Sequence, residues 1–320
     1  MWRTFLCLAI LAAATLNLWV VRTQAHPQQP IPPPAREIAI TIDDLPLNGP
    51  QFDAARLQVM TRKLLGAFNQ YQVPAVGFVN ESLIYQPGEA EARIAILKAW
   101  SDAGIELGNH TFSHLGFSNA SLADYEDDFI RGDTILRMLL RPKEQKPRYF
   151  RHPFLQMGST LQLEKAFEAF IAERGYQAAP ITIDSLDWYI LAAYRDAQEQ
   201  QDSEMLKRVS AEYIRYNERK FDYCEQAAAD LFGRPIKHIL LLHANELNGD
   251  NLDDLLRMLK KRGYQFIPLE QALKDPVYQF PDQYQPTSDW LSHWSASKGR
   301  PFNPPAPPDF IQSAYLRHQR

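Results

Sequence analysis

The chain has 320 residues, of which 45% are hydrophobic and 22% are charged, so it can bury a full core and is not an intrinsically disordered polymer. Lys and Arg number 34 against 38 Asp and Glu, a net charge of −4, which provides no basic field of the kind that nucleic-acid backbones attract. We therefore expect no nucleic-acid partner. The chain contains only two cysteines, Cys7 and Cys224, which rules out a disulfide framework.

Residues 1–25 have the charged, apolar and small-residue order of a secretory signal, with an apolar run from Thr4 to Val21 and a plausible cleavage point after Ala25. An uncleaved membrane anchor is the main alternative, and a buried core helix is a third. Signal and anchor would both export the rest of the chain, to the periplasm or beyond the cell. The segment 26–36 holds five prolines and is expected to be an extended linker.

From residue 37 onward, short apolar runs rich in β-formers alternate with longer helical patterns. The expected strands are Glu37–Asp43, Ala75–Val79, Ile105–Asn109, Arg148–Arg151, Gln177–Ile183, His238–His243 and Tyr264–Ile267. The expected helices are Phe52–Tyr71, Glu89–Ala103, Ser121–Leu140, Thr160–Arg174, one or two within Ala197–Leu231, and Leu252–Arg262. This alternation predicts parallel βαβ units, in an open doubly wound sheet or a closed barrel.

Ionisable side chains stand where five of these strands end. They are Asp43 and Asp44, His110, Arg151 and His152, Asp184 with Asp187 just beyond, and His243. Because the carboxyl ends of parallel strands meet at one rim, we predict that these residues form one convergent site.

The adjacent carboxylates Asp43 and Asp44 would point to opposite faces of a continuing strand. Both can face one pocket if the chain leaves the strand there, and Pro46 is expected to supply that break. The alternative for this pair is a solvated turn or a helix cap.

His110 and His114 are four residues apart, and one helical turn between them would let both imidazoles hold one divalent ion. The alternative is one core histidine and one surface histidine. Two histidines and a carboxylate occur in catalytic zinc sites and in non-haem iron oxygenases. Iron enzymes usually draw the carboxylate from two residues after the first histidine, where this chain has Phe112, so a hydrolytic ion is favoured.

Five ordered motifs together resemble those of the polysaccharide deacetylases with a NodB homology domain, carbohydrate esterase family 4. The motifs are Thr41-Ile42-Asp43-Asp44, His110-Thr111-Phe112-Ser113-His114, Arg151-His152-Pro153-Phe154, Asp184-Ser185-Leu186-Asp187-Trp188 and Leu241-Leu242-His243. They span 41–243, within an expected single catalytic domain at 37–275 that has a helical insertion at about 190–235. Residues 276–320 are expected to form an irregular extension.

The resemblance implies a distorted (β/α)7 barrel of parallel strands and the removal of acetyl groups from sugars, most often N-acetyl groups. It implies that Asp44, His110 and His114 bind one divalent metal ion, most often zinc, with cobalt, nickel or manganese as alternatives. Asp43 would then be the general base on the attacking water, and His243 would be the general acid.

The remaining roles follow from the same resemblance. Arg151 would orient Asp43, and Asp187 would hold His243 and stabilise its charge. The residues expected to line the substrate site are His152, whose backbone N–H would stabilise the oxyanion, together with Pro153, Phe154, Trp188 and Leu241. The chain departs from the family at Leu45-Pro46 and at Leu155, where glycine is usual, and both changes are expected to reshape the cleft.

The sequence therefore predicts an exported, metal-dependent hydrolase that acts on an acetylated glycan, such as a cell-wall or chitin-like polysaccharide, and gives no sign of a protein partner. Two alternatives stay open. The protein could be an O-acetyl esterase or a small-molecule amidohydrolase of the same superfamily, or a glycan-binding protein without catalysis.

Overall fold

The computed structural model describes residues 36–47, 52–280 and 289–319. The predicted signal or anchor at 1–25 and the linker at 26–36, except Arg36, lie outside these residues. The described residues belong to one compact unit. Within the described ranges, no helix combines the length and apolar character needed to cross a bilayer.

The core of the fold is a sheet in which every recorded strand pair is parallel. Its strands are β1 (Arg36–Leu45), β2 (Val76–Val79), β3 (Glu106–Asn109), β4 (Tyr149–Phe150), β5 (Gln177–Ala178), β6 (Ile183–Asp184), β7 (His238–His243) and β8 (Tyr264–Phe266). The order is β5-β4-β3-β2-β1-β7-β6, and β8 pairs with the start of β1. The predicted α/β class is confirmed, as a distorted (β/α)7 barrel that stays open between β5 and β6 among the described residues.

The single strand predicted at Gln177–Ile183 is wrong. This segment forms β5 and β6, which lie at the two ends of the strand order. Pro180 stands between them, and because proline has no N–H to donate it cannot continue a sheet ladder.

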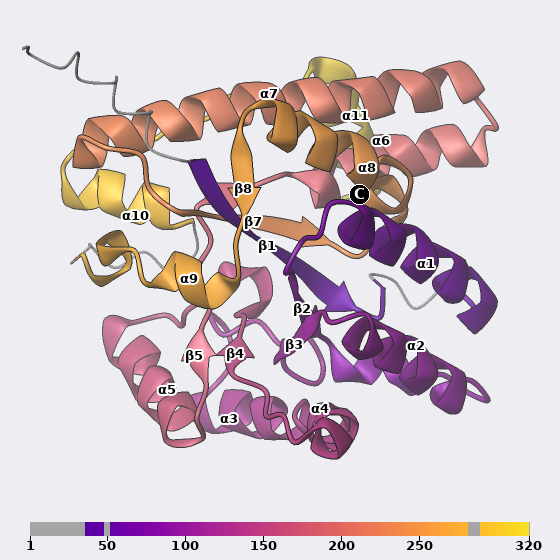
Figure 1. The fold of residues 1–320 in the computed structure, drawn as a ribbon, viewed down its shortest axis with the longest axis vertical. Coiled ribbons are helices and arrows are strands. Elements are labelled where there is room, and N and C mark those ends of the chain that lie inside the picture. Colours follow the sequence, from indigo (N-terminus) through magenta and orange to yellow (C-terminus); the bar gives the residue numbers. More distant parts are fainter. Residues whose placement is uncertain (1–35, 48–51, 281–288, 320) are drawn as a thin grey trace, which may run out of the picture. The chain divides into compact units, whose positions relative to one another are not determined.

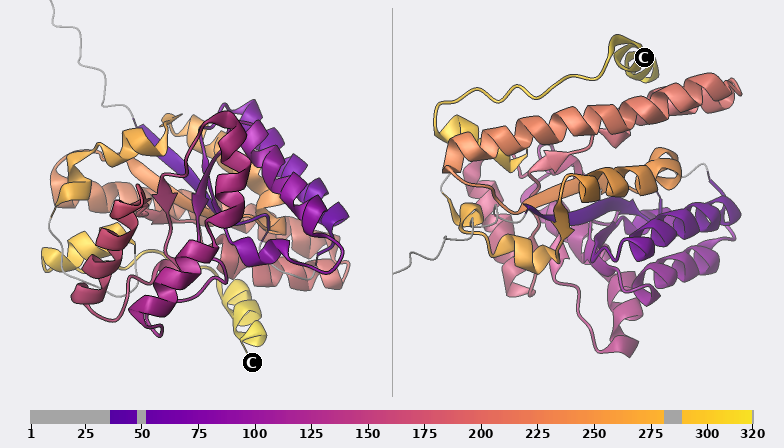
Figure 2. Two further views of the ribbon diagram at one scale, coloured as in Figure 1. Left: turned by 90° about the horizontal axis from the view of Figure 1, so that it is seen from below. Right: turned by 45° about the horizontal axis from the view of Figure 1, so that its top comes forward.

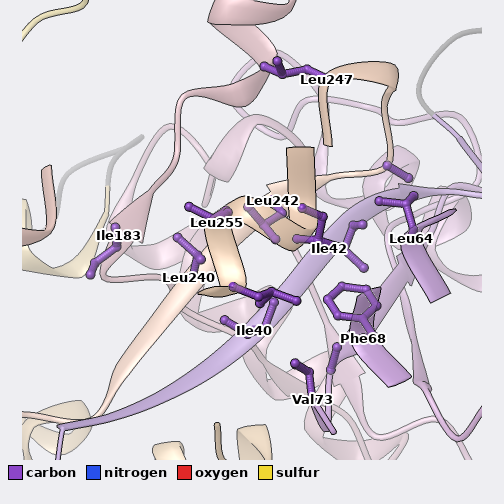
Figure 3. Packing of buried hydrophobic residues seen from close by; sticks show 14 of the residues in the cluster. Ile40, Ile42, Leu64, Phe68, Val73, Ile183, Leu240, Leu242, Leu247 and Leu255 are labelled. Atoms are coloured by element: carbon purple, nitrogen blue, oxygen red, sulfur yellow. The ribbon is translucent and has the colours of Figure 1, made fainter. Parts of the chain in front are cut away.

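The alternation along β1 sorts its side chains between two layers. Ile38, Ile40 and Ile42 belong to the large core cluster that includes Leu64 and Phe68 of α1 (Ala54–Gln70). Figure 3 shows Ile40 and Ile42 packed beside Leu240 and Leu242 of β7, with Leu255 of α8 (Glu246–Lys261) close by. Since strand side chains alternate, Thr41 and Asp43 turn to the inner side of the sheet.

The other helices lie around the sheet (Figure 1). They are α2 (Ala90–Asp102), α3 (Leu122–Arg131), α4 (Thr134–Leu140), α5 (Leu161–Glu173), α6 (Asp187–Glu199), α7 (Ser203–Phe232), α9 (Leu269–Leu273), α10 (Trp290–Ser297) and α11 (Asp309–His318). Short 3-10 turns occur at Glu81–Ile84, Arg141–Lys143, Pro153–Leu155 and Pro276–Gln279. Side-chain oxygens of Asp53, Ser121, Thr160, Asp202 and Asn245 accept backbone N–H groups at the starts of α1, α3, α5, α7 and α8.

Several predicted helices differ from the observed ones. The helix predicted at Ser121–Leu140 is two helices, α3 and α4, and a Cβ on Gly132 between them would lie 2.5 Å from the carbonyl carbon of Thr111. The expected insertion consists of α6 and α7. The extension predicted to be irregular contains α10 and α11, so that description is wrong for much of 290–318. Buried Leu291, Trp294 and Ile311 provide the apolar contacts that hold these two helices.

Candidate active site

Asp44, His110 and His114 meet at the carboxyl ends of β1 and β3. The Nε2 atom of His110 lies 3.5 Å from Asp44 Oδ1, and the Nε2 atom of His114 lies 3.4 Å from the same oxygen. Asp44 and His110 are buried, and His114 is partly exposed. The structure thus brings together the three residues predicted to bind a metal.

Asp43 and Asp44 both face this site because β1 carries a bulge. The register between β1 and β2 shifts between Ile42 and Leu45, and Asp44 has a φ of 66°, in the left-handed region. The break therefore comes at Asp44, and not at Pro46 as predicted. The side chain of Leu45 is buried in the core against Gly77, so it does not reshape the cleft.

His110 and His114 approach each other through a loop, and the helical turn predicted between them is wrong. Thr111 and His114 have φ values of 62° and 59°. Asp128 of α3 fixes this loop, because its backbone carbonyl accepts the N–H of Phe112 at 3.0 Å and its Oδ2 accepts the N–H of Ser113 at 3.0 Å. Sequence reasoning missed Asp128, because no pattern links it to the histidine loop.

The three residues fit a divalent cation. The Nδ1 atom of His110 lies 2.8 Å from the carbonyl of Arg151, which can only accept, so Nδ1 carries the hydrogen and Nε2 presents a lone pair. Burial lowers the pKa of His110 well below its usual value, and burial also lowers the pKa of His114 despite the opposing charge of Asp44.

The Nε2 lone pair of His110 therefore faces Asp44 Oδ1, a buried oxygen without a hydrogen-bond partner anywhere in the described ranges, and Nε2 of His114 points to the same oxygen. Such an arrangement is repulsive unless a cation lies between the atoms. Tetrahedral bonds of about 2.0–2.2 Å place ligand atoms about 3.3–3.6 Å apart, which matches the two measured separations.

Asp43 lies beside the cluster and close to Arg151. Its Oδ2 is 3.8 Å from His110 Nε2 and 3.7 Å from Arg151 Nη1, while its Oδ1 has no hydrogen-bond partner in the part of the chain that the structure describes. Burial raises the pKa of Asp43 to about 6, although the positive charges of Arg151 and His243 oppose the shift. A carboxylate with a raised pKa and a free oxygen can accept a proton near neutral pH.

Arg151 is held rigidly behind Asp43. Its Nη2 donates to Thr41 Oγ1 at 3.0 Å, and that hydroxyl donates to the carbonyl of Leu240 at 2.7 Å. The guanidinium also lies over the ring of Phe78, 4.9 Å from its centroid. Thr41 is thus a further positioning residue, which sequence reasoning missed although it belongs to the first motif.

His243 and Asp187 form a hydrogen-bonded pair on the other side of Asp43, because β7 pairs with β1 and His243 is the register partner of Asp43. Asp187 Oδ1 lies 2.8 Å from His243 Nδ1, and Oδ2 accepts the backbone N–H of His243 at 2.7 Å. Burial disfavours the charged ring, but attraction to Asp187, with smaller contributions from Asp44 and Asp43, raises the pKa of His243 to about 10.

Two buried amides hold Asp187 in place. Its Oδ2 accepts Nδ2 of Asn245 at 3.1 Å and also accepts Nδ2 of Asn248. Tyr213 of α7 donates its hydroxyl to Asn248 Oδ1 at 2.7 Å, so α7 supports the rim of the candidate site. Asn245 and Asn248 have the spacing of a helix cap, so the sequence does not predict that they also bind Asp187.

A cavity of about 430 Å³ opens over these residues. The predicted site residues that line it are Asp43, Asp44, His110, His114, His152, Phe154, Trp188, Leu241 and His243. Arg151, Asp187 and Pro153 are buried and do not line this cavity. Phe154 is 60% exposed and Trp188 is 38% exposed, and Trp188 Nε1 donates to Asp184 Oδ2 at 3.2 Å.

The ring of His152 serves the packing of the site. Its Nδ1 accepts the hydroxyl of Tyr125 at 3.0 Å, and the ring stacks near Tyr125 and Phe117. Burial lowers the pKa of His152 to about 3, so the ring is neutral at physiological pH. Leu155 lines the cavity with a φ of 55°, so the departure from glycine at this position does add bulk to the cleft.

Comparisons with known proteins agree with the motifs. The sequence model of the polysaccharide deacetylase family matches residues 31–169. The peptidoglycan-N-acetylglucosamine deacetylase of Bacillus cereus is 24% identical over 240 residues, 73% of this chain and 66% of the relative. The chain therefore matches just under two thirds of that relative's length.

Similar solved structures include a CE4 family pseudoenzyme from Bacillus anthracis, at 16% identity and a TM-score of 0.49, covering 76% of this chain and 66% of the other. A peptidoglycan deacetylase from Bacillus subtilis has 18% identity and a TM-score of 0.46, covering 76% of this chain and 94% of the other. The match over residues 31–169 and the ordered motifs show that this chain is similar to the polysaccharide deacetylase family.

Proposed function

We propose that this protein is a metal-dependent hydrolase that removes N-acetyl groups from a glycan. The observation that carries the proposal is the placement of a candidate base, Asp43, and a candidate acid, His243, beside the cluster of Asp44, His110 and His114 in one cavity. Amide hydrolysis needs all three functions, since water must be activated, the carbonyl polarised and the leaving amine protonated.

Asp44, His110 and His114 would hold the metal ion, for which we propose zinc, with cobalt, nickel or manganese as alternatives. When bound, such an ion lowers the pKa of water towards about 7 and polarises the amide carbonyl. The carbonyl of Arg151 fixes the His110 ring so that Nε2 faces the cluster.

Asp43 accepts the proton of the attacking water. Its Oδ1 has no hydrogen-bond partner among the described residues and can therefore accept the proton, and its neighbour Arg151 stabilises the charged form of the carboxylate. The amide carbon then becomes tetrahedral, and the backbone N–H of His152 donates to its developing negative oxygen.

His243 donates a proton to the leaving nitrogen as the carbon–nitrogen bond breaks. Its raised pKa keeps the ring charged at neutral pH, and Asp187 holds Nδ1 so that Nε2 is the donor. Trp188 and Leu241 line the same cavity and would enclose the acetyl methyl group. The products are acetate and a free amine on the glycan.

For the substrate we propose an N-acetylglucosamine-containing polymer, of the cell-wall or chitin-like class. The similarity to the Bacillus cereus peptidoglycan-N-acetylglucosamine deacetylase and the exposed aromatic rings Phe154 and Trp188 at the cavity support this class. We further propose export to the periplasm or beyond the cell, on the signal-like order of residues 1–25.

Acetate release tests the proposed function directly. Purified protein, stripped of metal and reloaded with zinc, cobalt or nickel, is expected to release acetate from N-acetylglucosamine oligomers, and chelation is expected to stop the release. Acetate from O-acetylated sugars alone would identify an esterase instead. Binding of the oligomers without acetate release under any metal would contradict the proposed activity and indicate a glycan-binding protein.

A further inference from the structure

The C-terminal helix α11 lies at the edge of the catalytic cavity, far along the chain from the family match at residues 31–169. Figure 2 shows the segment between α10 and α11 running beside α7 before α11 begins. The ring of Phe302 lies 5.3 Å from that of Tyr223 in α7, and the N–H of Asn303 donates to the Tyr223 hydroxyl at 2.6 Å. These contacts hold the segment before α11 against α7, and α11 follows at the edge of the cavity.

Contacts with α6 fix α11 there. Ile311 and Ala314 are buried on its inner side. At its end, Arg317 Nη2 and His318 Nε2 each lie 2.6 Å from a carboxylate oxygen of Asp196 in α6. The helix is therefore an integral wall of the site.

Tyr315 is the aromatic residue that α11 brings to the cavity. Its ring stacks on Tyr189 at 4.0 Å and 24°, and it meets the ring of Trp188 at 5.6 Å and 77°. Tyr315 and Trp188 line the cavity, and Tyr189 supports the Tyr315 ring from α6. The two lining rings form an aromatic corner beside the position proposed for the acetyl group.

We propose that Tyr315 is a substrate-binding residue that packs against a sugar ring of the glycan next to the acetylated unit. This inference rests on the proposed function. Tyrosine presents a large, rigid and amphipathic surface, and the apolar C–H groups of a sugar ring can pack against it. The ring of Tyr315 contacts Trp188 and Tyr189, both in α6. The residues proposed to bind the metal and Asp43 come from other elements. We therefore expect Tyr315 to bind substrate and to take no part in the chemical step.

Kinetics on a soluble N-acetylglucosamine tetramer test this role. Tyr315→Ala is expected to raise KM roughly tenfold and to leave kcat within about twofold, because the lost contact is made equally in the ground and transition states. Tyr315→Phe keeps the ring and is expected to restore KM. Leu316→Ala is the matched control, since Leu316 is on the same helix, 58% exposed and outside the cavity lining.

A binding measurement separates this inference from the proposed function. Calorimetry measures how tightly the same tetramer binds to each Tyr315 and Leu316 variant when that variant also carries Asp43→Asn. If the wild-type protein releases no acetate, the proposed function is overturned. The binding measurement would still show whether Tyr315 contacts the tetramer. Weaker binding by the Tyr315→Ala variant, restored by phenylalanine, supports the inference. Equal KM and equal affinity for the Tyr315→Ala and Leu316→Ala variants would overturn it, as would a fall in kcat at unchanged KM.

Discussion

Asp43→Asn is expected to reduce acetate release by about 10³-fold while one metal ion per chain remains bound, because the change removes the general base and keeps the shape of the side chain. Asp43 lies beside the cluster of Asp44, His110 and His114 and is not one of its three members. The asparagine side chain has the same shape, so we expect the cluster to stay in place. The measurements are kcat on N-acetylglucosamine oligomers and metal content. The control is Asp127→Asn, the same change at an exposed position on α3.

The same variant provides an independent check through stability. The folded pKa of Asp43 is about 6, above the usual 3.8, so the stability of the metal-free wild type falls as pH rises between these values and then stays level. The Asp43→Asn variant avoids that loss and should gain on the order of 3 kcal/mol above about pH 6, and little near pH 4. Denaturant unfolding at both pH values measures the difference. A variant with normal activity, or with no gain in stability at neutral pH, would contradict the role of Asp43.

His243→Ala is expected to lower kcat on the amide substrate by about 10²- to 10⁴-fold and to lower kcat on an activated acetyl ester far less, since a good leaving group needs no acid.

Asp187→Asn removes the carboxylate that raises the pKa of His243 to about 10, so burial then lowers that pKa. The alkaline limb of the kcat profile should therefore move to lower pH in the Asp187→Asn variant. An unmoved alkaline limb, or equal losses on amide and ester, would show that His243 is not the acid.

The pair also influences folding. In the metal-free protein the raised pKa of His243 means that its charged form adds stability below about pH 6.5, and that this contribution is lost as pH rises towards 10. The Asp187→Asn variant should therefore lose more stability at pH 6 than at pH 10. Thermal unfolding of both proteins at the two pH values measures this difference.

The sequence predicted which residues gather at one rim, because side chains at the carboxyl ends of parallel strands meet there. Asp43, His110 and His243 each stand where a strand ends, and strand ends can be read from apolar runs. Pro180 lies inside the strand predicted at Gln177–Ile183, and because proline cannot donate to a sheet ladder it indicated the break between β5 and β6.

The local backbone of the site could not be predicted. Asp44, Thr111 and His114 are not glycines, yet all three have left-handed φ values. Propensity disfavours that conformation, and the contacts that impose it, such as those of Asp128 with the histidine loop, join residues distant in sequence.

The position of Tyr315 at the cavity could not be predicted from the sequence either. Its position at the cavity depends on the path of residues 300–308 beside α7 and on the anchoring of α11 by Asp196. Proline-rich composition around 301–308 indicates an irregular path and says nothing of where the path leads.

Calorimetric titration of the metal-free protein with zinc shows whether Asp44, His110 and His114 bind one cation together. We expect one ion per chain for the wild type and for the control His318→Ala, whose histidine lies on α11 outside the cluster. His110→Ala and His114→Ala should each weaken zinc binding by at least about 100-fold, because each removes one of three protein ligands. Zinc affinity unchanged in both variants, or a wild type that binds no divalent ion, would show that these three residues do not share a cation.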